Sequence, residues 1–459
     1  MNAIYQFLRE HDYELPDEEY YDKIREFQDW YEDGADDFHK LRWFNGIQEV
    51  SREMSRLSMA KTVAEDWANL LLNEKVEINT EDEQAQKDLD EILKRNKFKV
   101  NANRLVEKAF ALGTGAFIEY LQDNEVSIDY VTAQHIFPLK WDSKGIHECA
   151  FGSEHMEGDD VIYYLQVHTR NRNKNYEIEN FRFKAEKDSD AYTEVPLPEG
   201  MTRKWNTNSR TPYFQIVMPN IVNNADMRNP LGISIYGNAI DILKQIDMAY
   251  DSLGNEVPLS RKMVFLRTDM FGIDTETGEM YSAIDKGDTV FHYLSSNPND
   301  NTPIIHEYSS SMRISEFREI IQENLNLLSK KCGMGTNFYE FNDHGLQTAT
   351  AVISDNADLF DSINKHELLL NDAVVGMAEA CLELSGHANA EVTVNFDDSI
   401  MQDTDAIKAQ AMVEYNAGLI DAVVYFMRVN SMTEEQAIKY VEAIRARNPQ
   451  PEPMPDLGA

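Results

Sequence analysis

Apolar residues recur at steps of three and four along most of the first hundred residues, a spacing typical of amphipathic helices. The run 10–37 combines thirteen acidic residues with a stripe of aromatic residues. We interpret it as a helix with a solvated acidic face. Further stripes predict helices over about 44–72 and over 87–97. The first hundred residues are therefore expected to be mainly helical.

The pattern changes to alternation after a pair of glycines. A helix is expected to end at Gly113 and Gly115, and strands are predicted over 116–121 and 126–130 with a short turn between them. The segment 146–192 alternates in the same way. An antiparallel sheet packed against helices is expected, which makes the fold class α+β.

Helical periodicity returns in the second half, on both sides of a β-rich insert. One apolar stripe predicts a helix from about 233 to 258, and another predicts a helix over 313–331. Between them, the segment 259–312 reads as a hairpin and a further strand. The segment 332–347 contains several glycines, so it is predicted to be a loop.

A long helix is predicted after this loop. Residues 348–384 contain no proline and a single glycine, Gly376, so an unbroken helix would span roughly 50 Å. A strand is expected over 391–396 and helices over 405–447, with a break at 416–418. The proline-rich tail is expected to lack regular structure.

Charge and composition exclude several classes of protein. The 459 residues include 43 bases and 80 acids, a formal net charge of −37, which argues against a protein that grips nucleic-acid phosphates tightly. Three cysteines, far apart and in no C-x-x-C pair, fit a reducing compartment. No signal peptide and no uninterrupted apolar stretch of about 18 residues is found, so a soluble protein is expected.

Sequence motifs for catalysis are absent. There is no phosphate-binding G-x-x-x-x-G-K-[ST] loop, no Rossmann glycine fingerprint and no H-E-x-x-H, and the eleven histidines are scattered. The turn 274–279 has too few acidic ligands for a calcium loop. Acid pairs such as Asp397 and Asp398 leave a metal-dependent nuclease open as an alternative. We expect no cofactor, no metal site and no enzymatic activity.

Three stretches carry a resemblance to a known family. In order along the chain they are FALGTGAFIEYLQDNEVSIDYVTAQHIFPLKWD, NPLGISIYGNAIDILKQIDMAYDSLGNEV and GLQTATAVISDNADLFDSINKHE. Together with the order helix, β-rich insert, helix, glycine-rich loop and long helix, they resemble the portal proteins of tailed double-stranded DNA bacteriophages, especially siphoviruses. The resemblance covers roughly residues 100 to 384.

The resemblance implies the division of a portal subunit. A peripheral wing would take 1–232, with a helical acidic part over 1–100 and an α+β part over 101–232. The remaining parts would be the first stem helix 233–258, the clip 259–312, the second stem helix 313–331, the tunnel loop 332–347, the long wing helix with its return strand 348–403, and the crown with its tail 404–459. This crown is shorter than is usual in the family.

The resemblance also implies a function and partners. Portal subunits form a homo-oligomer, a ring of about twelve copies at one capsid vertex, through which double-stranded DNA passes during packaging and ejection. The implied partners are the terminase large subunit, a later head-completion adaptor, the major capsid protein and the scaffold, with no membrane. The implied location is the virion, after assembly in the host cytoplasm. Another minor capsid or adaptor protein is a further alternative.

The acidity gains a physical meaning if the ring surrounds DNA, because like charges keep the polyanion from adhering to the wall. Lys330 and Lys331 would contact phosphates transiently, or would only complement the helix dipole. The acids would line the bore, or would only keep long helices solvated. The candidate channel residues are Asp247, Asp251, Glu316, Glu319, Glu323, Lys330, Lys331, Asn337, Glu340, Asp343 and His344.

Ring closure requires two different surfaces of each subunit to meet. The strands of the clip and apolar residues of the long helix are candidates for such contacts, and core packing within the chain is the alternative for the helix. The helix residues concerned are Leu359, Phe360, Ile363, Leu368 and Val374.

Overall fold

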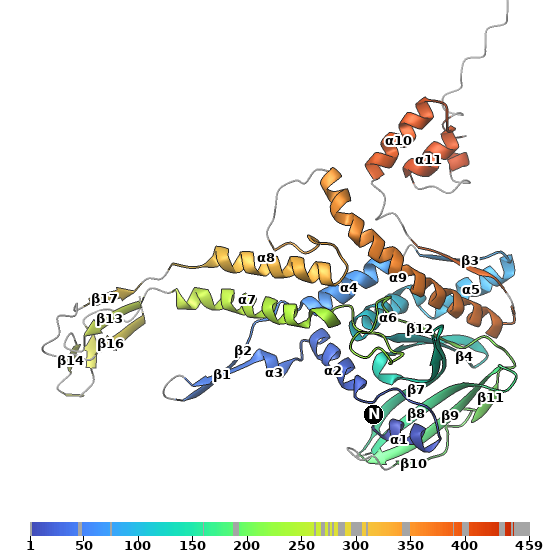
Figure 1. Cartoon of the computed structure of the whole chain (residues 1–459), viewed down its shortest axis with the longest axis horizontal. Coiled ribbons are helices and arrows are strands. Elements are labelled where there is room, and N and C mark those ends of the chain that lie inside the picture. The colour runs from blue at the N-terminus through green and yellow to red at the C-terminus, as the bar shows by residue number, and fades with distance from the viewer. Residues whose placement is uncertain are drawn as a thin grey trace, which may run out of the picture. The chain divides into compact units, whose positions relative to one another are not determined.

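The fold was analysed in a computed structural model of the chain, and it is α+β as expected (Figure 1). Two compact units are present, one formed by residues 1–74 and 78–394 and the other by 75–77 and 395–459. The structure describes residues 2–44, 48–73, 76–158, 160–186, 192–260, 311–341, 349–388, 390–396, 404–430, 437–441 and 444, and the backbone of short strands and one turn between 263 and 308.

The N-terminal hundred residues are mainly helical. Within the acidic run, the helix is α2, whose stripe of buried residues includes Tyr20, Ile24 and Phe27, so the predicted amphipathic character is confirmed for that segment. The N-terminal elements are α1 (Asn2–Glu10), α2 (Tyr20–Tyr31), α3 (Asp36–His39), β1 (Lys40–Phe44), β2 (Glu49–Glu53), α4 (Met59–Leu71), β3 (Glu77–Thr80), α5 (Glu83–Arg95) and α6 (Phe98–Leu112).

The helix predicted from about 44 to 72 is wrong in its first half. Strands β1 and β2 pair as an antiparallel hairpin, with Trp43 opposite Val50, and the helix α4 begins only at Met59. Ser58 before it has a φ of 56°, a left-handed conformation that cannot continue a helix backwards. Hydrogen bonds to Asp247 and Asp251, far along the chain, hold this segment extended, although its apolar residues have a helical spacing.

Two antiparallel sheets follow. The helix α6 ends at Gly113 and leads into the predicted pair of strands, which is confirmed. One sheet has the order β12-β4-β5, and the other has the order β10-β9-β8-β7-β6 with β11 paired to β9. The strands are β4 (Gly115–Gln122), β5 (Glu125–Thr132), β6 (Ile136–Asp142), β7 (Gly145–Glu157), β8 (Asp160–Arg170), β9 (Tyr176–Glu186), β10 (Tyr192–Glu194), β11 (Lys204–Asn206) and β12 (Phe214–Val217).

A close backbone approach sets the start of the next helix. A Cβ atom on Gly113 would lie 2.4 Å from the carbonyl oxygen of Gly232, and Gly113 has a φ of +91°, so only glycine fits there. The amide of Ile235 donates to the carbonyl of Phe110 at 2.9 Å. These contacts hold residues 232–236 against the end of α6, so the helix predicted from 233 begins at Ile240.

Two helices, α7 (Ile240–Leu259) and α8 (Ile314–Lys331), lie side by side (Figure 1). The range predicted for the second agrees with α8 to within one residue. Between them in the chain are β13 (Met263–Arg267), β14 (Phe271–Ile273), β15 (Met280–Ser282), β16 (Val290–Leu294) and β17 (Ile305–Tyr308). Strand β13 pairs with β16 in parallel and with β17 antiparallel, while β14 and β15 form a hairpin.

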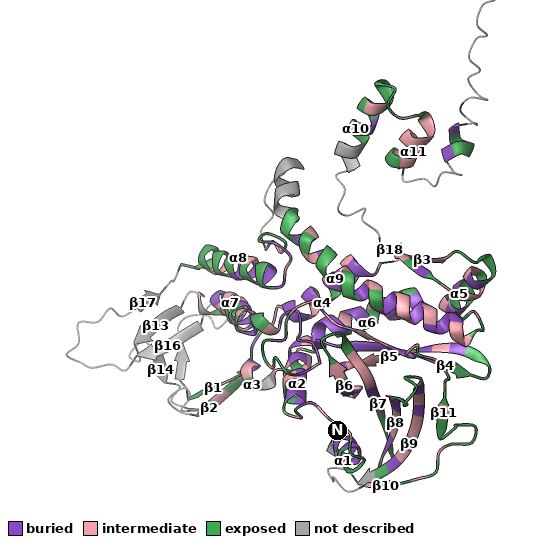
Figure 2. Cartoon of the chain, turned by 45° about the vertical axis from the view of Figure 1, so that its right-hand side comes forward, coloured by how far each residue is buried: buried purple, intermediate pink, exposed green. Residues whose placement is uncertain are grey.

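The long helix is confirmed as α9 (Ala349–Leu384). Figure 2 shows buried residues where α6 and α9 lie over β4 and β5 and where α4 packs on α6 and α9. Leu359, Ile363 and Val374 are buried there, so they belong to the core of the chain, whereas Leu368 is exposed. Phe360 is partly buried. Strand β18 (Val392–Asn395) pairs with β3.

The second unit contains α10 (Thr404–Asn416) and α11 (Ala422–Asn430). The predicted break between them is confirmed, with Gly418 at a φ of +71°. The acid pair Asp397 and Asp398 and the proline-rich tail lie outside the described residues, as does most of the turn 274–279.

Candidate nucleic-acid interface

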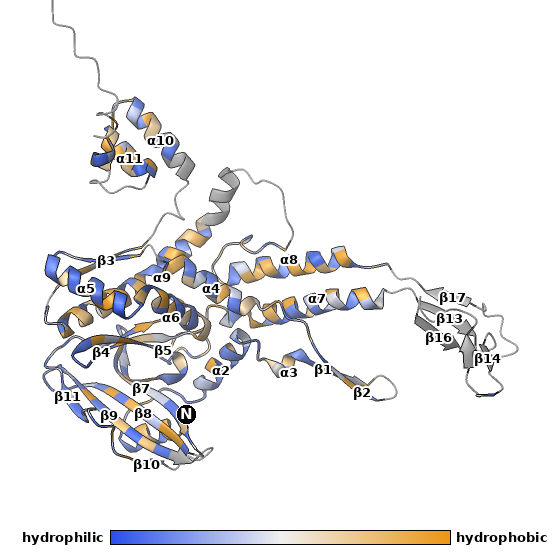
Figure 3. Ribbon diagram, turned by 180° about the vertical axis from the view of Figure 1, so that it is seen from behind, coloured by the Kyte–Doolittle hydropathy of each residue, from blue (hydrophilic) through white to orange (hydrophobic). Residues whose placement is uncertain are grey.

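The helix α8 presents a row of acids to solvent. Ile321, Leu325 and Leu328 form its buried stripe, and Glu316, Glu319 and Glu323 lie on the exposed side. Residues three and four apart share a helix face, so the three carboxylates form one acidic row. Figure 3 shows hydrophilic and hydrophobic residues interspersed along the ribbons of α7 and α8, as expected for helices that bury only one side.

An ion pair joins the C-terminal end of α7 to the N-terminal end of α8. The guanidinium of Arg313 donates to both carboxylate oxygens of Glu256, at 3.2 and 3.0 Å, and its backbone amide donates to Glu256 as well. These bonds lower the pKa of Glu256. Since Glu256 lies in the last turn of α7 and Arg313 directly precedes α8, the pair joins the two antiparallel helices where the chain enters and leaves the β-rich insert.

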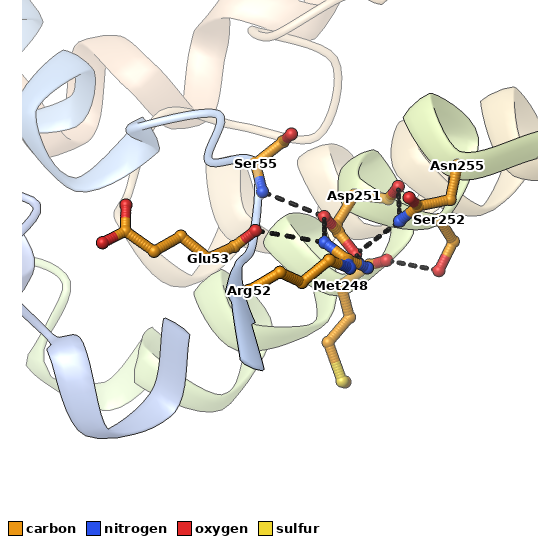
Figure 4. Close-up of polar contacts among 7 residues, drawn as sticks. All are labelled: Arg52, Glu53, Ser55, Met248, Asp251, Ser252 and Asn255. Atoms are coloured by element: carbon orange, nitrogen blue, oxygen red, sulfur yellow. Dashed lines mark hydrogen bonds and ion pairs between the residues drawn. The ribbon is translucent and has the colours of Figure 1, made fainter. Parts of the chain in front are cut away.

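The acid Asp251 on α7 is buried in an ion pair. The two terminal guanidinium nitrogens of Arg52 donate to it, at 2.7 and 2.6 Å, and the backbone amide of Ser55 and the side-chain amide of Asn255 also donate to it, at 3.0 Å each (Figure 4). The hydrogen bond from Arg52 is the main reason that the pKa of Asp251 is lowered. This bidentate geometry is the strongest arrangement that an arginine offers a carboxylate.

Asp247, one helical turn earlier, is also buried. It accepts from the amide of Leu57 at 2.9 Å, and its other oxygen lies 2.9 Å from Nε2 of His39. Nδ1 of His39 faces the carbonyl of Ala35 at 3.0 Å, so Nδ1 must carry hydrogen. The contact between Nε2 and Asp247 then requires one further proton, on the ring or on the carboxyl. Burial raises the pKa of Asp247.

The sequence interpretation of α7 therefore needs a correction. Asp247 and Asp251 were expected on a solvated acidic face, but each is only 5% exposed. They bind the segment that runs from His39 to Leu57, some 200 residues earlier in the chain. We withdraw both from the candidate channel residues, because a side chain buried within the subunit cannot face a bore. The sequence does not predict their partners His39 and Arg52. The one local signal is that Asp247, Asp251 and Asn255 recur every four residues, which places them on one face of α7.

The first part of the predicted loop is tied to the body of the chain. The indole of Trp67 donates to the carbonyl of Cys332 at 3.0 Å, and the hydroxyl of Tyr339 donates to Asp66 at 2.9 Å. The side-chain amide of Gln322 bonds the backbone of Tyr339 and of Phe341. Burial raises the pKa of Asp66, and the bond from Tyr339 acts against that rise.

The polar residues of this region differ in accessibility. Asn337 and Glu340 are exposed, whereas Asp343 and His344 lie outside the described residues. Lys330 and Lys331 are exposed at the C-terminal end of α8, where positive charge complements the helix dipole. The helix α8 thus carries an acidic row and, at its C-terminal end, two exposed lysines beside the loop that follows it. The chain as a whole has a net charge of −37.

Within the part of the chain that the structure describes, no group of three or more His, Cys, Asp and Glu residues is arranged to hold a metal ion. Among these same residues, no helix combines the length and the apolar character needed to cross a bilayer. The three cysteines are buried free thiols.

Comparison with known proteins gives one family. The family model for phage portal proteins like SPP1 Gp6 matches residues 10–450, nearly the whole chain. No curated protein matches the chain. Members of this family are structural components of the viral capsid. They form oligomers, which assemble with the capsid and with DNA. The extent of the match shows that the chain belongs to the phage portal protein family.

Proposed function

We propose that the chain is the subunit of a closed ring, about twelve copies at one capsid vertex, that conducts double-stranded DNA during packaging and ejection. The observation that carries this proposal is the family match over residues 10–450. The order of elements supports it, since α7, a β-rich insert, α8, a tethered loop and the 36-residue α9 follow one another as in the portal arrangement.

The elements are assigned to the parts of a portal on this basis. Helices α7 and α8 form the stem, with the clip between them in the chain, and the tunnel loop follows α8. The wing takes residues 1–232 together with α9 and β18, and residues 404–459, which contain α10 and α11, form the crown. The bonds from Trp67, Gln322 and Tyr339 support this assignment, because they hold the start of the proposed tunnel loop on the body while Asn337 and Glu340 stay exposed, as residues facing a bore would.

The channel wall is proposed to repel DNA along α8. In a ring, Glu316, Glu319 and Glu323 recur on every subunit and form stacked acidic rings. Their field reaches about 8 Å at physiological salt, so it acts on DNA only near the wall. Lys330 and Lys331 form one basic ring beside the tunnel loop, where phosphates bind briefly. Together they keep the cargo centred and mobile.

The partners follow from the same assignment. The clip, which contains β13 to β17, is proposed to dock the terminase large subunit during packaging and a head-completion adaptor afterwards. The wing contacts the major capsid protein and, during assembly in the host cytoplasm, the scaffold.

Particle size tests the proposal. Twelve copies of a 52.8 kDa chain form a ring of roughly 0.6 MDa, which mass photometry and negative-stain microscopy of the purified protein will detect. A monomer or small oligomer that cleaves DNA with a divalent cation would overturn it and favour a nuclease. A monomer without such cleavage would favour an adaptor.

A further inference from the structure

The hairpin of β1 and β2 lacks the packing that normally stabilises such an element. None of its ten strand residues is buried, and among the strands that the structure describes, β1 and β2 pair only with each other. Trp43 is 44% exposed and Phe44 is 65% exposed. A lone two-stranded hairpin is marginally stable in water, and exposed sheet edges favour association with another chain. The hairpin is therefore a candidate for an interaction surface.

The base of the hairpin is held firmly on α7. Arg52 of β2 makes its two bonds to Asp251, and the amide of Met54 donates to the carbonyl of His39 at 2.8 Å. Figures 1 and 3 both show the hairpin projecting away from α2 and α3. The buried acids of α7 thus act as an anchor that presents Trp43 and Phe44 to solvent at the end of a fixed arm.

We propose that this arm, formed by β1 and β2, packs Trp43 and Phe44 against a neighbouring copy of the same chain. The inference rests on the proposed ring, in which each subunit must offer two different surfaces to its neighbours. Exposed tryptophan and phenylalanine are typical of the residues that dominate the energy of protein interfaces.

Charge favours a second copy over DNA as the occupant. Strand β1 contains Lys40 and Arg42 and no acid, while the chain as a whole has a net charge of −37, so a second copy presents an excess of acids to this strand. On the paired strand, Glu49 lies opposite Phe44 and Glu53 opposite Lys40, and both acids are exposed. DNA would offer these acids only phosphates, whereas a second copy also carries 43 basic residues and can complement both signs of charge on the hairpin.

The first test compares two double variants of the full chain. Trp43→Ala with Phe44→Ala removes the aromatic end. Leu121→Ala with Met156→Ala removes apolar side chains of matched exposure, 45% and 56%, from another surface. By mass photometry at equal concentration, the arm variant is expected to form at least tenfold fewer rings than the wild type, with an unchanged melting temperature of the subunit. The control is expected to form rings normally.

Rings from the arm variant at wild-type yield would overturn the inference. Loss of rings by both variants would overturn it as well, because the effect would then not be specific to the arm. Absence of rings in the wild-type protein would contradict the proposed function itself, and so the two failures are distinguishable.

A second test locates the contact. Benzoylphenylalanine in place of Phe44, illuminated in assembled rings, is expected to give a ladder of linked subunits beginning at the dimer. Mass spectrometry of the linked peptides will then identify the receiving surface. Products linked only within one chain would show that the arm folds back on its own subunit.

Discussion

The helices α7 and α8 lie side by side and both carry regularly spaced acids, yet they use them in opposite ways. On α7, Asp247 and Asp251 point into the subunit and bind the segment around β1 and β2. On α8, Glu316, Glu319 and Glu323 face solvent. An acidic stripe in a sequence therefore does not by itself indicate a solvated face, because the partners that bury it can lie anywhere in the chain.

The comparison separates an anchoring role from an electrostatic one. The acids of α7 position the hairpin, and their removal is expected to change stability. Among the residues that the structure describes, none outside α8 forms a hydrogen bond or ion pair with Glu316, Glu319 or Glu323, and removal of these acids is expected to change how DNA behaves in the ring. The following predictions test this distinction, beginning with the largest effect.

The ion pair of Arg52 with Asp251 is expected to give the largest stability change. Arg52→Met keeps most of the apolar stem but leaves a buried carboxylate without its cation, which costs about 2 kcal/mol, less than for a fully buried pair because the Arg52 side chain is 34% exposed. Urea unfolding measures the change. The control is Arg203→Met, which breaks an exposed pair with Glu194 and should cost under about 1 kcal/mol. Equal losses would contradict the anchoring role.

The buried acid Glu119 should respond to removal in the opposite direction, by a gain in stability. Glu119 in β4 is fully buried, and within the described part of the chain neither of its carboxylate oxygens has a hydrogen-bond partner on another residue, so burial raises its pKa. Because the folded-state pKa is raised, stability falls as pH rises above the ordinary value towards that pKa. Glu119→Met should stabilise the chain by about 1 kcal/mol at pH 7 and by less near pH 4. Destabilisation at pH 7 would show that an unseen group pairs with Glu119.

Asp251 should give the opposite dependence on pH. Its pKa is lowered in the folded state by Arg52, so its contribution to stability is present above the ordinary pKa of aspartic acid and is lost as pH falls through the folded value. Asp251→Asn should therefore cost about 1 kcal/mol at pH 7 and progressively less as pH falls below about 4. Ser252→Ala on the same helix provides a control without a titrating group. A penalty for Asp251→Asn that is constant between pH 7 and pH 3 would contradict this assignment.

The row on α8 should give the smallest stability change and a distinct functional one. Replacing Glu316, Glu319 and Glu323 with glutamine should alter stability by less than about 0.5 kcal/mol. Rings of this variant should retain linear DNA longer than wild-type rings at low salt, with the difference vanishing at high salt.

A matched variant separates local from overall charge in that experiment. Replacing the exposed Glu14, Glu81 and Glu91 with glutamine removes the same charge from elsewhere on each subunit. If both triple variants retain DNA equally, the row on α8 has no special place beside the bore.

The periodicity of apolar residues predicted two kinds of element. These are strands that pair with a neighbour close in the sequence and helices with a long stripe of apolar residues. The helices α8 and α9, the pair β4 and β5 and the end of α6 at Gly113 were all found in this way. The strands β1 and β2 were missed because their apolar residues also fit a helical spacing. What decides their conformation is the bonding of Arg52 and His39 to a helix two hundred residues later.

The candidate site was less predictable than the fold. Glu316, Glu319 and Glu323 lie on the exposed face, as their spacing against the buried stripe of α8 indicates. No local signal distinguished them from Asp247 and Asp251, whose burial depends on partners distant in the sequence. The tethering of the loop by Trp67 and Tyr339 was equally out of reach, because each bond joins residues more than 250 positions apart.

A reconstruction of the assembled ring by electron cryo-microscopy tests the central claim most directly. We expect about twelve subunits around an open channel, with the row Glu316, Glu319 and Glu323 of α8 facing the axis and Asp247 and Asp251 enclosed within each subunit. A ring in which α8 turns these carboxylates outward, or a particle with no channel, would contradict the account.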